Sequence, residues 1–107
     1  MTWSFAFLNA EVRAELEALP VDMRANFERI VRLVQSVGLE QVHEPYIRHL
    51  EGRLWEMRLK GKAGIARAIY LTAVGRRVVI LRVFVKKTQK TPRREIDLAL
   101  KRAGEVR

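Results

Sequence analysis

Cysteine is absent from this chain of 107 residues, which excludes disulfide bonds and thiolate metal ligands. Only two histidines occur, and no His, Asp and Glu residues have the spacing of a metal site. Glycine-rich phosphate loops and Ser-His-Asp arrangements are also missing. No apolar run approaches the roughly 20 residues that span a bilayer, and residues 1–10 lack the pattern of a signal peptide. We therefore expect a cytoplasmic protein that binds no membrane and needs no metal or other cofactor.

Acidic residues are scarce in the second half of the chain. Residues 1–57 hold six Lys/Arg and nine Asp/Glu, whereas residues 58–107 hold fifteen Lys/Arg and three acids, which gives net charges of −3 and +12. A field this uneven favours a polyanionic partner, either nucleic acid or an acidic protein. The alternative interpretation, from charge alone, is a surface that keeps the protein soluble.

The first third of the chain has clear periodicity. Aromatic residues at every second position predict a strand over residues 2–8. Asn9 is a suitable N-cap for a helix that runs to about Leu19, where Pro20 ends it. A longer helix is predicted over residues 21–37, because its apolar side chains keep the 3.6-residue period for four turns. These two helices are expected to form a hairpin that lies on a sheet.

Residues 38–53 show no clear period, so an irregular connection is predicted there. Three strands follow at 54–60, 65–73 and 76–87, and the turns between them contain Gly61, Gly64 and Gly75, where a positive φ is expected. Thr91 and Pro92 are typical of the N-cap and first residue of a final helix. We predict one α+β domain over residues 1–107, with the order β-α-α-β-β-β-α. The sheet is expected to be antiparallel, with two N-terminal helices packed on one face and a C-terminal helix.

The turns predict how the three strands align. A two-residue turn at residues 74–75 and a turn centred between residues 62 and 63 would place Arg58, Arg67 and Arg82 in one row across the sheet. Like charges in that position are destabilising by about 0.2–1 kcal/mol per pair, whereas a bound phosphate would make the row favourable. We interpret the row as a phosphate site. A register error of one residue, or arginines that extend into water, remains the alternative.

Phosphodiester cleavage without a metal requires RNA, because its 2′-hydroxyl group is then the nucleophile and the protein supplies positive charge, a base and an acid. Glu56 lies on the same predicted face and is a candidate general base, with a salt bridge to Arg58 or Arg67 as the alternative. Residues 86–92 carry three lysines that could hold a nucleic-acid backbone or form a solvated loop. His43 and His49 are interpreted as structural or surface residues.

Three stretches carry a resemblance to a known family. They are Leu-Glu-Gly-Arg-Leu-Trp-Glu-Met-Arg at 50–58, Arg-Ala-Ile-Tyr at 67–70, and Val-Phe-Val-Lys-Lys-Thr-Gln-Lys-Thr-Pro at 83–92. The sequence closely resembles the phage-derived branch of the RelE/HigB toxin family over nearly its whole length. The resemblance implies an antiparallel sheet with two N-terminal helices on one face and a cleft on the other. It also implies cleavage of messenger RNA, free or on the ribosome, and neutralisation by a helix-turn-helix antitoxin.

Matched by position, the resemblance implies a catalytic role for Arg58, a phosphate-stabilising role for Arg67, and a basic residue near Lys87. Glu56 departs from the pattern, since RelE toxins commonly have lysine there. The last helix also lacks the tyrosine of some members, and the histidines of HigB near the last strand are missing. Our predicted site comprises the catalytic residues Arg58, Arg67, Lys87 and Glu56 and the RNA-binding residues Arg82, Lys86 and Lys90.

The leading hypothesis is the toxin of a type II toxin–antitoxin system, acting as a metal-independent endoribonuclease through 2′-hydroxyl transesterification. The first alternative is a ParE-like toxin, which has the same fold but inhibits a protein such as gyrase and has no nuclease activity. The second alternative is a basic binding module of phage origin without toxicity. The predicted arginine row favours the nuclease, because an inhibitor of gyrase needs no phosphate site on its sheet.

Overall fold

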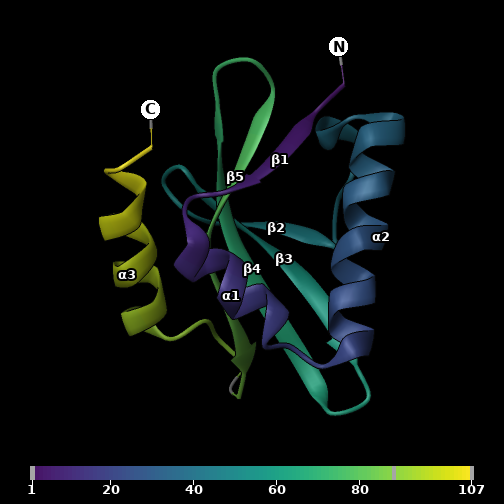
Figure 1. The fold of residues 1–107 in the computed structure, drawn as a ribbon, viewed down its shortest axis with the longest axis vertical. Helices are drawn as coiled ribbons and strands as arrows, with labels where there is room; N and C mark the ends of the chain where they lie inside the picture. Colours follow the sequence, from purple (N-terminus) through teal and green to yellow (C-terminus); the bar gives the residue numbers. More distant parts are fainter. Residues whose placement is uncertain (1, 88, 107) are drawn as a thin grey trace.

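A computed structural model describes residues 2–87 and 89–106. Three helices and a five-stranded sheet form an α+β fold, which confirms the predicted class (Figure 1). Except for one additional strand, the order of the elements is the predicted one. The elements are β1 (Ser4–Phe7), α1 (Ala10–Glu17), α2 (Val21–Val37), a 3₁₀ turn (Leu39–Gln41), β2 (Ile47–Glu51), β3 (Leu54–Gly61), β4 (Gly64–Ala73), β5 (Arg77–Lys86) and α3 (Arg93–Ala103).

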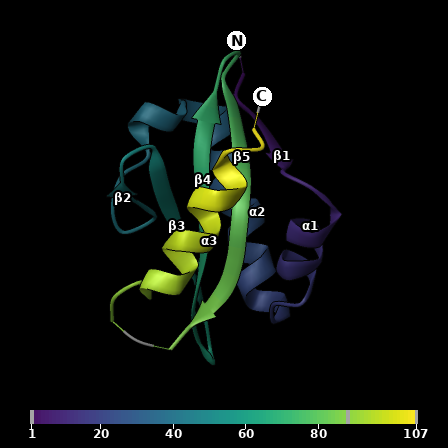
Figure 2. The ribbon, with the colours of Figure 1, turned by 90° about the vertical axis from the view of Figure 1, so that its left-hand side faces the viewer.

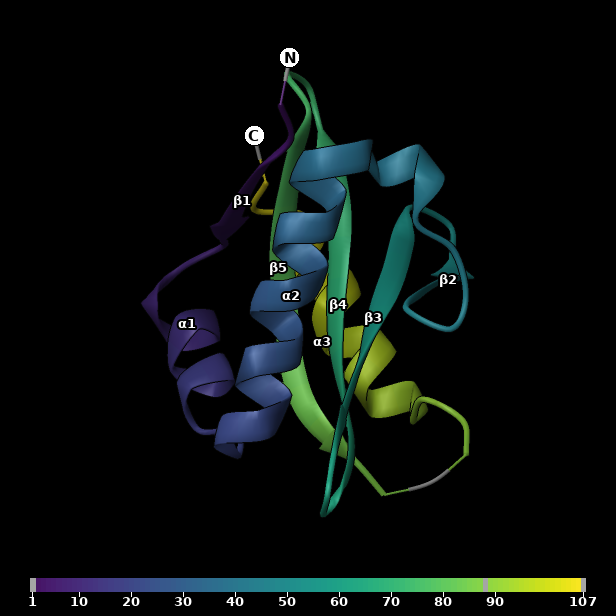
Figure 3. The ribbon, with the colours of Figure 1, turned by 90° about the vertical axis from the view of Figure 1, so that its right-hand side faces the viewer.

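The helical hairpin forms where the sequence predicts it. The backbone N–H of Val12 donates a 3.0 Å hydrogen bond to the side chain of Asn9, which is the expected N-cap of α1. Pro20 separates the helices and stands at the N-terminus of α2. Figure 3 shows α2 lying across the sheet, and the apolar stripe of the helix belongs to the core between them. Its buried members are Met23, Phe27, Ile30 and Val34.

The sheet has the strand order β1-β5-β4-β3-β2. The pairs β3–β4 and β4–β5 are antiparallel, as predicted, and β2, which was not predicted, also pairs antiparallel with β3. In contrast, β1 and β5 run parallel. No hairpin turn fixes their relative direction, because the rest of the sheet and both N-terminal helices separate them in the sequence.

The strand β2 lies inside the segment that we expected to be irregular. It forms a hairpin with β3 around a two-residue turn at Gly52 and Arg53, where Gly52 has a φ of 54°. A register shift between His49 and Glu51 interrupts the pairing. Because a bulge breaks the period-2 alternation, this strand has no clear signature in the sequence.

The predicted register is correct for one hairpin and wrong for the next. Arg58 lies opposite Arg67 across β3 and β4, as expected. Between β4 and β5 the turn contains three residues, 74–76, and a bulge near the middle of the hairpin adds a second offset. The two offsets move β5 by two positions, so that Phe84 rather than Arg82 lies opposite Arg67. The predicted row of three arginines is therefore wrong.

Two of the three turn glycines have the positive φ that we predicted, 143° at Gly64 and 87° at Gly75. Gly61 does not, and a different constraint acts there. A Cβ atom at Gly61 would lie 2.6 Å from the carboxylate of Asp22, at the start of α2. The tip of the β3–β4 hairpin is thus packed closely against the helix.

The sheet is covered on both faces, which creates two hydrophobic cores. The α1–α2 hairpin covers one face, where Met57, Leu59, Ala68 and Tyr70 are among the buried residues. Helix α3 packs on the opposite face and contributes Ile96 and Ala99 to a smaller core with Leu54, Ile69, Leu71, Val79, Leu81 and Phe84. Figure 2 shows α3 over the middle and upper parts of β4 and β5, with the lower ends of the strands uncovered.

Helix α3 begins one residue later than predicted. Pro92 is its N-cap and makes no side-chain capping hydrogen bond, so Thr91 is not the cap. The hydroxyl group of Thr91 instead donates a 2.6 Å hydrogen bond to Glu56 on β3. The side chain of Thr91, which we predicted to cap the helix, therefore contacts the sheet instead.

Candidate functional site

A basic cavity occupies the end of the sheet that α3 leaves uncovered. Its volume is about 460 Å³. The lining residues come from β3, β4, the end of β5 and the segment after it: Arg58, Gly64, Ile65, Arg67, Lys86, Lys87 and Gln89. Four of these seven side chains are cationic and none is a carboxylate, so the cavity is suited to an anion.

A buried ion pair forms the floor of this basic cavity. Glu56 and Arg67 are each only 1% exposed, and Glu56 Oε2 lies 2.9 Å from Arg67 Nη1. Since Thr91 donates to the other carboxylate oxygen, both oxygens of Glu56 are occupied within the protein. This geometry agrees with the salt-bridge alternative for Glu56. A carboxylate so enclosed holds Arg67 in place rather than facing a substrate.

The pairing of Arg67 with Glu56 leaves part of its hydrogen-bonding capacity unused. Neither Nε nor Nη1 of Arg67 has a hydrogen-bond partner among the described residues, because the approach of Glu56 lacks hydrogen-bond geometry. The Nε atom of Arg58, on the neighbouring strand, is likewise buried without a partner. A buried unsatisfied donor costs about 1–3 kcal/mol, so these guanidinium groups are held in place at a cost to stability.

Positive charge in the basic cavity is not balanced by nearby carboxylates. Arg48 on β2 lies opposite Glu56, which places it on the same sheet face. Burial lowers the pKa of Arg67, Glu56 opposes that effect, and the charges of Arg58 and Arg48 add to it. Within residues 2–87 and 89–106, no carboxylate forms an ion pair with Arg48, Arg58, Lys86 or Lys87.

The surroundings of Lys86 in the basic cavity lower its pKa. Burial and the positive charges of Arg67, Arg58 and Arg48 lower its pKa from the ordinary value of 10.5, although Glu56 acts in the opposite direction. Its ammonium group donates a hydrogen bond to the carbonyl oxygen of Gln89, which also lines the cavity. A lysine in such surroundings is suited to proton transfer.

Arg82 lies outside the basic cavity, in a network of ion pairs between α1, β5 and α3. Its guanidinium is 2.9 Å from Glu15 and 2.7 Å from Glu95. Burial alone would lower its pKa, but the hydrogen bonds and charges of these two carboxylates raise it overall. The same network contains Arg102, which pairs with Glu15 at 3.0 Å. Both carboxylates thus bind Arg82 to its neighbours, and this geometry favours a structural role over the predicted contact with RNA.

Of the remaining predicted residues, one lines the basic cavity and one does not. Lys87 lines the basic cavity and is exposed, whereas Lys90 is exposed and lies outside the lining. Thr88, between them, is outside the described residues. His49 contacts the carbonyl oxygen of Gly52 at 2.7 Å, and its ring packs on that of Trp55, in agreement with a structural role.

Two residues of the basic cavity region escaped the sequence analysis, Arg48 and Thr91. Arg48 was missed because β2 was not predicted. The two residues Gly52 and Arg53 between possible strands were the available signal, since such a pair is typical of a tight hairpin. Thr91 was assigned to a cap instead, and no local pattern reveals that its hydroxyl group would reach Glu56 35 positions away.

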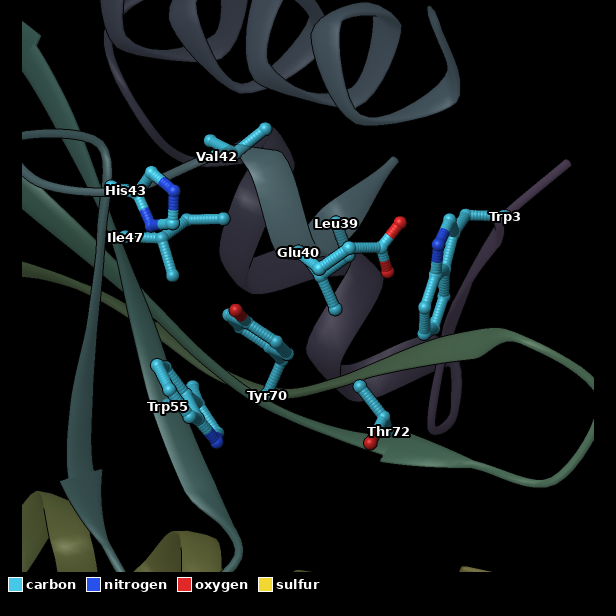
Figure 4. Close-up of a pocket in the computed structure, with 9 residues that line it drawn as sticks. All are labelled: Trp3, Leu39, Glu40, Val42, His43, Ile47, Trp55, Tyr70 and Thr72. Carbon is cyan, nitrogen blue, oxygen red and sulfur yellow. The ribbon is translucent and has the colours of Figure 1, made fainter. Parts of the chain in front are cut away.

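A second cavity, of different character, lies on the sheet face that the α1–α2 hairpin covers. It has a volume of about 380 Å³ and is lined by Trp3, Leu39, Glu40, Val42, His43, Ile47, Trp55, Tyr70 and Thr72. In Figure 4 the rings of Trp55 and Tyr70, which are cross-strand partners, lie on one side and that of Trp3 on the other, with the carboxylate of Glu40 directed towards Trp3. The lining contains no lysine or arginine, so this aromatic cavity has no feature of a phosphate site.

Two further properties concern the described part of the chain as a whole. None of its helices is both long and apolar enough to cross a membrane. No three of its His, Asp or Glu side chains gather closely enough to hold a metal ion.

Comparison with known proteins supports the sequence resemblance. The model of the family described as Phage derived protein Gp49-like (DUF891) matches residues 14–104. A mutant of the E. coli toxin RelE in the free state superposes with a TM-score of 0.67 and 16% identity, over 95% of this chain and 98% of that one. The archaeal RelE from the RelE-RelB complex of Pyrococcus horikoshii OT3 gives a TM-score of 0.57 and 21% identity, over 81% and 98%. Among curated proteins, no significant sequence match was found.

Proposed function

Because this chain belongs to the phage-derived Gp49-like family and has a RelE-like fold, we propose that it is the toxin of a type II toxin–antitoxin pair and cleaves messenger RNA, free or on the ribosome. One observation carries the most weight. The basic cavity holds several cations on an open sheet face with only one carboxylate, which is buried beneath them. An RNA phosphate is the ligand that would balance this charge.

The proposed reaction uses groups of the RNA and of the cavity. The 2′-oxygen attacks the adjacent phosphorus, the bond to the 5′-oxygen breaks, and a 2′,3′-cyclic phosphate remains. Lys86 lines the cavity and has a lowered pKa, so it is the proposed acceptor of the proton of the 2′-hydroxyl group. Lys87, which is exposed at the mouth, donates a proton to the departing 5′-oxygen. Arg58 from the wall and Arg67 from the floor stabilise the negative charge that develops on the phosphate.

Glu56 acts as a positioning residue in this mechanism. It keeps the buried guanidinium of Arg67 beneath the phosphate and is itself held by Thr91. The lysine that RelE toxins commonly have at this position would contact the substrate directly. Because a buried glutamate stands at this position here, another residue of the cavity must transfer the proton. Lys86 is the candidate, since its surroundings lower its pKa.

The cognate partner in this proposal is a helix-turn-helix antitoxin with acidic or apolar segments. An uncovered cavity of this charge would bind RNA, so neutralisation requires that the antitoxin cover it or compete for it. The solved archaeal relative is a RelE-RelB complex, which supports a partner of this general kind. Toxin, antitoxin and messenger RNA would meet in the cytoplasm.

Induction of this chain without its partner tests the proposed function. Growth should stop while translated messages fragment and DNA topology stays normal. The fragments should end in a 5′-hydroxyl group and a cyclic or 3′-phosphate, because 2′-oxygen attack leaves those ends. The matched control is Arg58→Ala, which removes a wall cation that has no ion pair. Intact messages with double-strand DNA breaks would instead support the ParE-like alternative, and normal growth would support a binding module.

A further inference from the structure

A third cavity lies beside the basic one, at the edge of β3. It has a volume of about 270 Å³ and is lined by Asn26, Arg29, Ile30, Pro45, Tyr46, Arg58 and Lys60. The edge is open here because the pairing of β2 with β3 ends at Ile47 and Met57. Beyond that point the backbone N–H of Arg58 donates a 2.9 Å hydrogen bond to the carbonyl oxygen of Tyr46.

The lining of this edge cavity combines positive charge with an aromatic ring. Arg29, Arg58 and Lys60 contribute three cations, and no carboxylate is among the lining residues. Tyr46 is 46% exposed, although a large aromatic side chain is usually less accessible when it has only a structural role. Ile30 provides an apolar floor. Cations for a phosphate and an aromatic surface for a base are the two features of single-strand recognition.

Arg58 connects the edge cavity with the basic cavity, because its side chain lines both. Its Nε atom is buried and has no hydrogen-bond partner among the described residues. A polymer with phosphates at regular intervals could place one phosphate on each side of this guanidinium. A compact anion would occupy one cavity only.

The edge cavity is held open by contacts between α2 and the end of β3. The side-chain amide of Asn26 donates a hydrogen bond to the carbonyl oxygen of Lys60. The backbone N–H of Lys62 donates to the carboxylate of Asp22 at 2.7 Å. These contacts fix the helix against the hairpin tip, so the cavity exists before a ligand binds and little ordering is needed on binding.

We infer that one RNA strand occupies both cavities, with the scissile phosphate in the basic cavity and, in the edge cavity, a nucleotide that lies beyond the two joined by that phosphate. The base of that nucleotide stacks on Tyr46, and Arg29 and Lys60 contact its phosphate. This assignment rests on the proposed function and extends it, because it makes α2 and the segment before β2 part of the substrate site. It predicts that affinity depends on the length of the RNA.

The test measures binding of two RNA oligonucleotides by fluorescence anisotropy, with 2′-O-methyl groups that prevent cleavage. One is a dinucleotide, which fills only the basic cavity, and the other has six nucleotides. Tyr46→Ala should weaken binding of the hexamer about tenfold and leave the dinucleotide unchanged, whereas Tyr46→Phe should bind both like the parent protein. Arg29→Ala should weaken hexamer binding and lower its dependence on salt by roughly one phosphate contact.

Arg32→Ala is the matched control, because Arg32 is an exposed arginine of the same helix that does not line the edge cavity. It should leave hexamer binding unchanged. Equal hexamer affinity for Tyr46→Ala and the parent would overturn the inference while leaving the proposed function intact. Absence of RNA binding by the parent would overturn both. If Arg29→Ala and Tyr46→Ala weakened only an acidic peptide and not RNA, the edge cavity would be a protein-binding site instead.

Discussion

Arg67 and Arg82 lie on the same face of the sheet, yet their surroundings act on them in opposite directions. Burial lowers the pKa of Arg67, and two nearby arginines add to this effect against its one carboxylate partner. Arg82 has carboxylates on two sides, from Glu15 and Glu95, and its pKa is raised. The face therefore contains one region with excess positive charge and one region where charges are balanced.

The balanced region has a structural task that explains its composition. The strand β1 pairs with β5 only as far as Ile80, so the rest of β5 is an open edge. Glu15 accepts a 3.0 Å hydrogen bond from the backbone N–H of Val83, and Arg102 donates a 2.8 Å hydrogen bond to the carbonyl oxygen of Leu81. Side chains of two helices thus replace the missing strand and protect the edge. The excess positive charge of the basic cavity protects no strand edge in this way, which favours a role in binding a ligand.

The largest effect is expected from Arg67→Met, which sharpens the contrast by removing the cation of the floor. The buried carboxylate of Glu56 would lose its partner, so unfolding should become easier by roughly 3–5 kcal/mol, measured by urea denaturation. Catalysis should fall by about 10²–10³ in single-turnover cleavage of RNA, because one stabilising charge is lost.

The double variant Arg67→Met with Glu56→Leu separates the two effects. It removes both buried charges together, which is often neutral for stability or even stabilising, so most of the lost stability should return. Cleavage should remain low, because the positive floor is still absent. Recovery of cleavage in the double variant would contradict the assigned role of Arg67.

A smaller effect, on the pH dependence of the rate, is expected from Lys86→Arg. In the parent protein the rate should rise with pH as Lys86 loses its proton, at a pH below the ordinary 10.5 because its pKa is lowered. The variant should lack this rise and cleave about a hundredfold more slowly, while it retains RNA binding. Lys90→Arg changes the same segment outside the cavity lining and should leave the profile unchanged. A rising limb that persists in Lys86→Arg would show that another group accepts the proton.

The pKa of Lys86 also has a consequence for stability, with a definite sign. Because the folded state holds this proton less tightly than the unfolded state, the protonated form opposes folding. Stability should therefore increase as the pH rises from the lowered pKa of Lys86 towards 10.5, and this increase should be absent in Lys86→Arg.

Local sequence patterns were sufficient for most of the fold. The period of α2 and the glycines around residues 61–64 identified the hairpins and the Arg58–Arg67 pair, since both signals operate over a few residues. A bulge and a third turn residue gave no such signal, and together they displaced Arg82 by two positions. Register errors of this kind accumulate along a hairpin, so the strand nearest the first turn was placed correctly and the next was not.

The candidate site was predictable in its residue types but not in its charge balance. Arg58 and Arg67 were identified from the strand pattern, and a salt bridge from Glu56 was one of the stated alternatives. Whether an arginine has a free charge depends on carboxylates that other elements bring to it. Glu15 reaches Arg82 from α1, far away in the sequence. Contacts of this length are properties of the tertiary structure, which is why the sequence alone assigned Arg82 to RNA.

The smallest effect on cleavage, and the clearest test of the comparison, is expected from Arg82→Met. This change leaves Glu15 and Glu95 with fewer partners, although Glu15 keeps its ion pair with Arg102. The side chain of Arg82 is 24% exposed, so solvent screens part of the loss and unfolding should become easier by only about 1–2 kcal/mol. RNA cleavage per folded molecule should stay within about twofold of the parent, because no phosphate contact is removed.

Arg58→Met, on the same face, should show the reverse pattern. Cleavage should fall by about 10², and stability should be unchanged or slightly higher because repulsion from Arg67 is relieved. Urea denaturation and single-turnover cleavage of both variants decide the matter. A loss of cleavage in Arg82→Met without a loss of stability would place Arg82 in the substrate site and remove the distinction between the two regions.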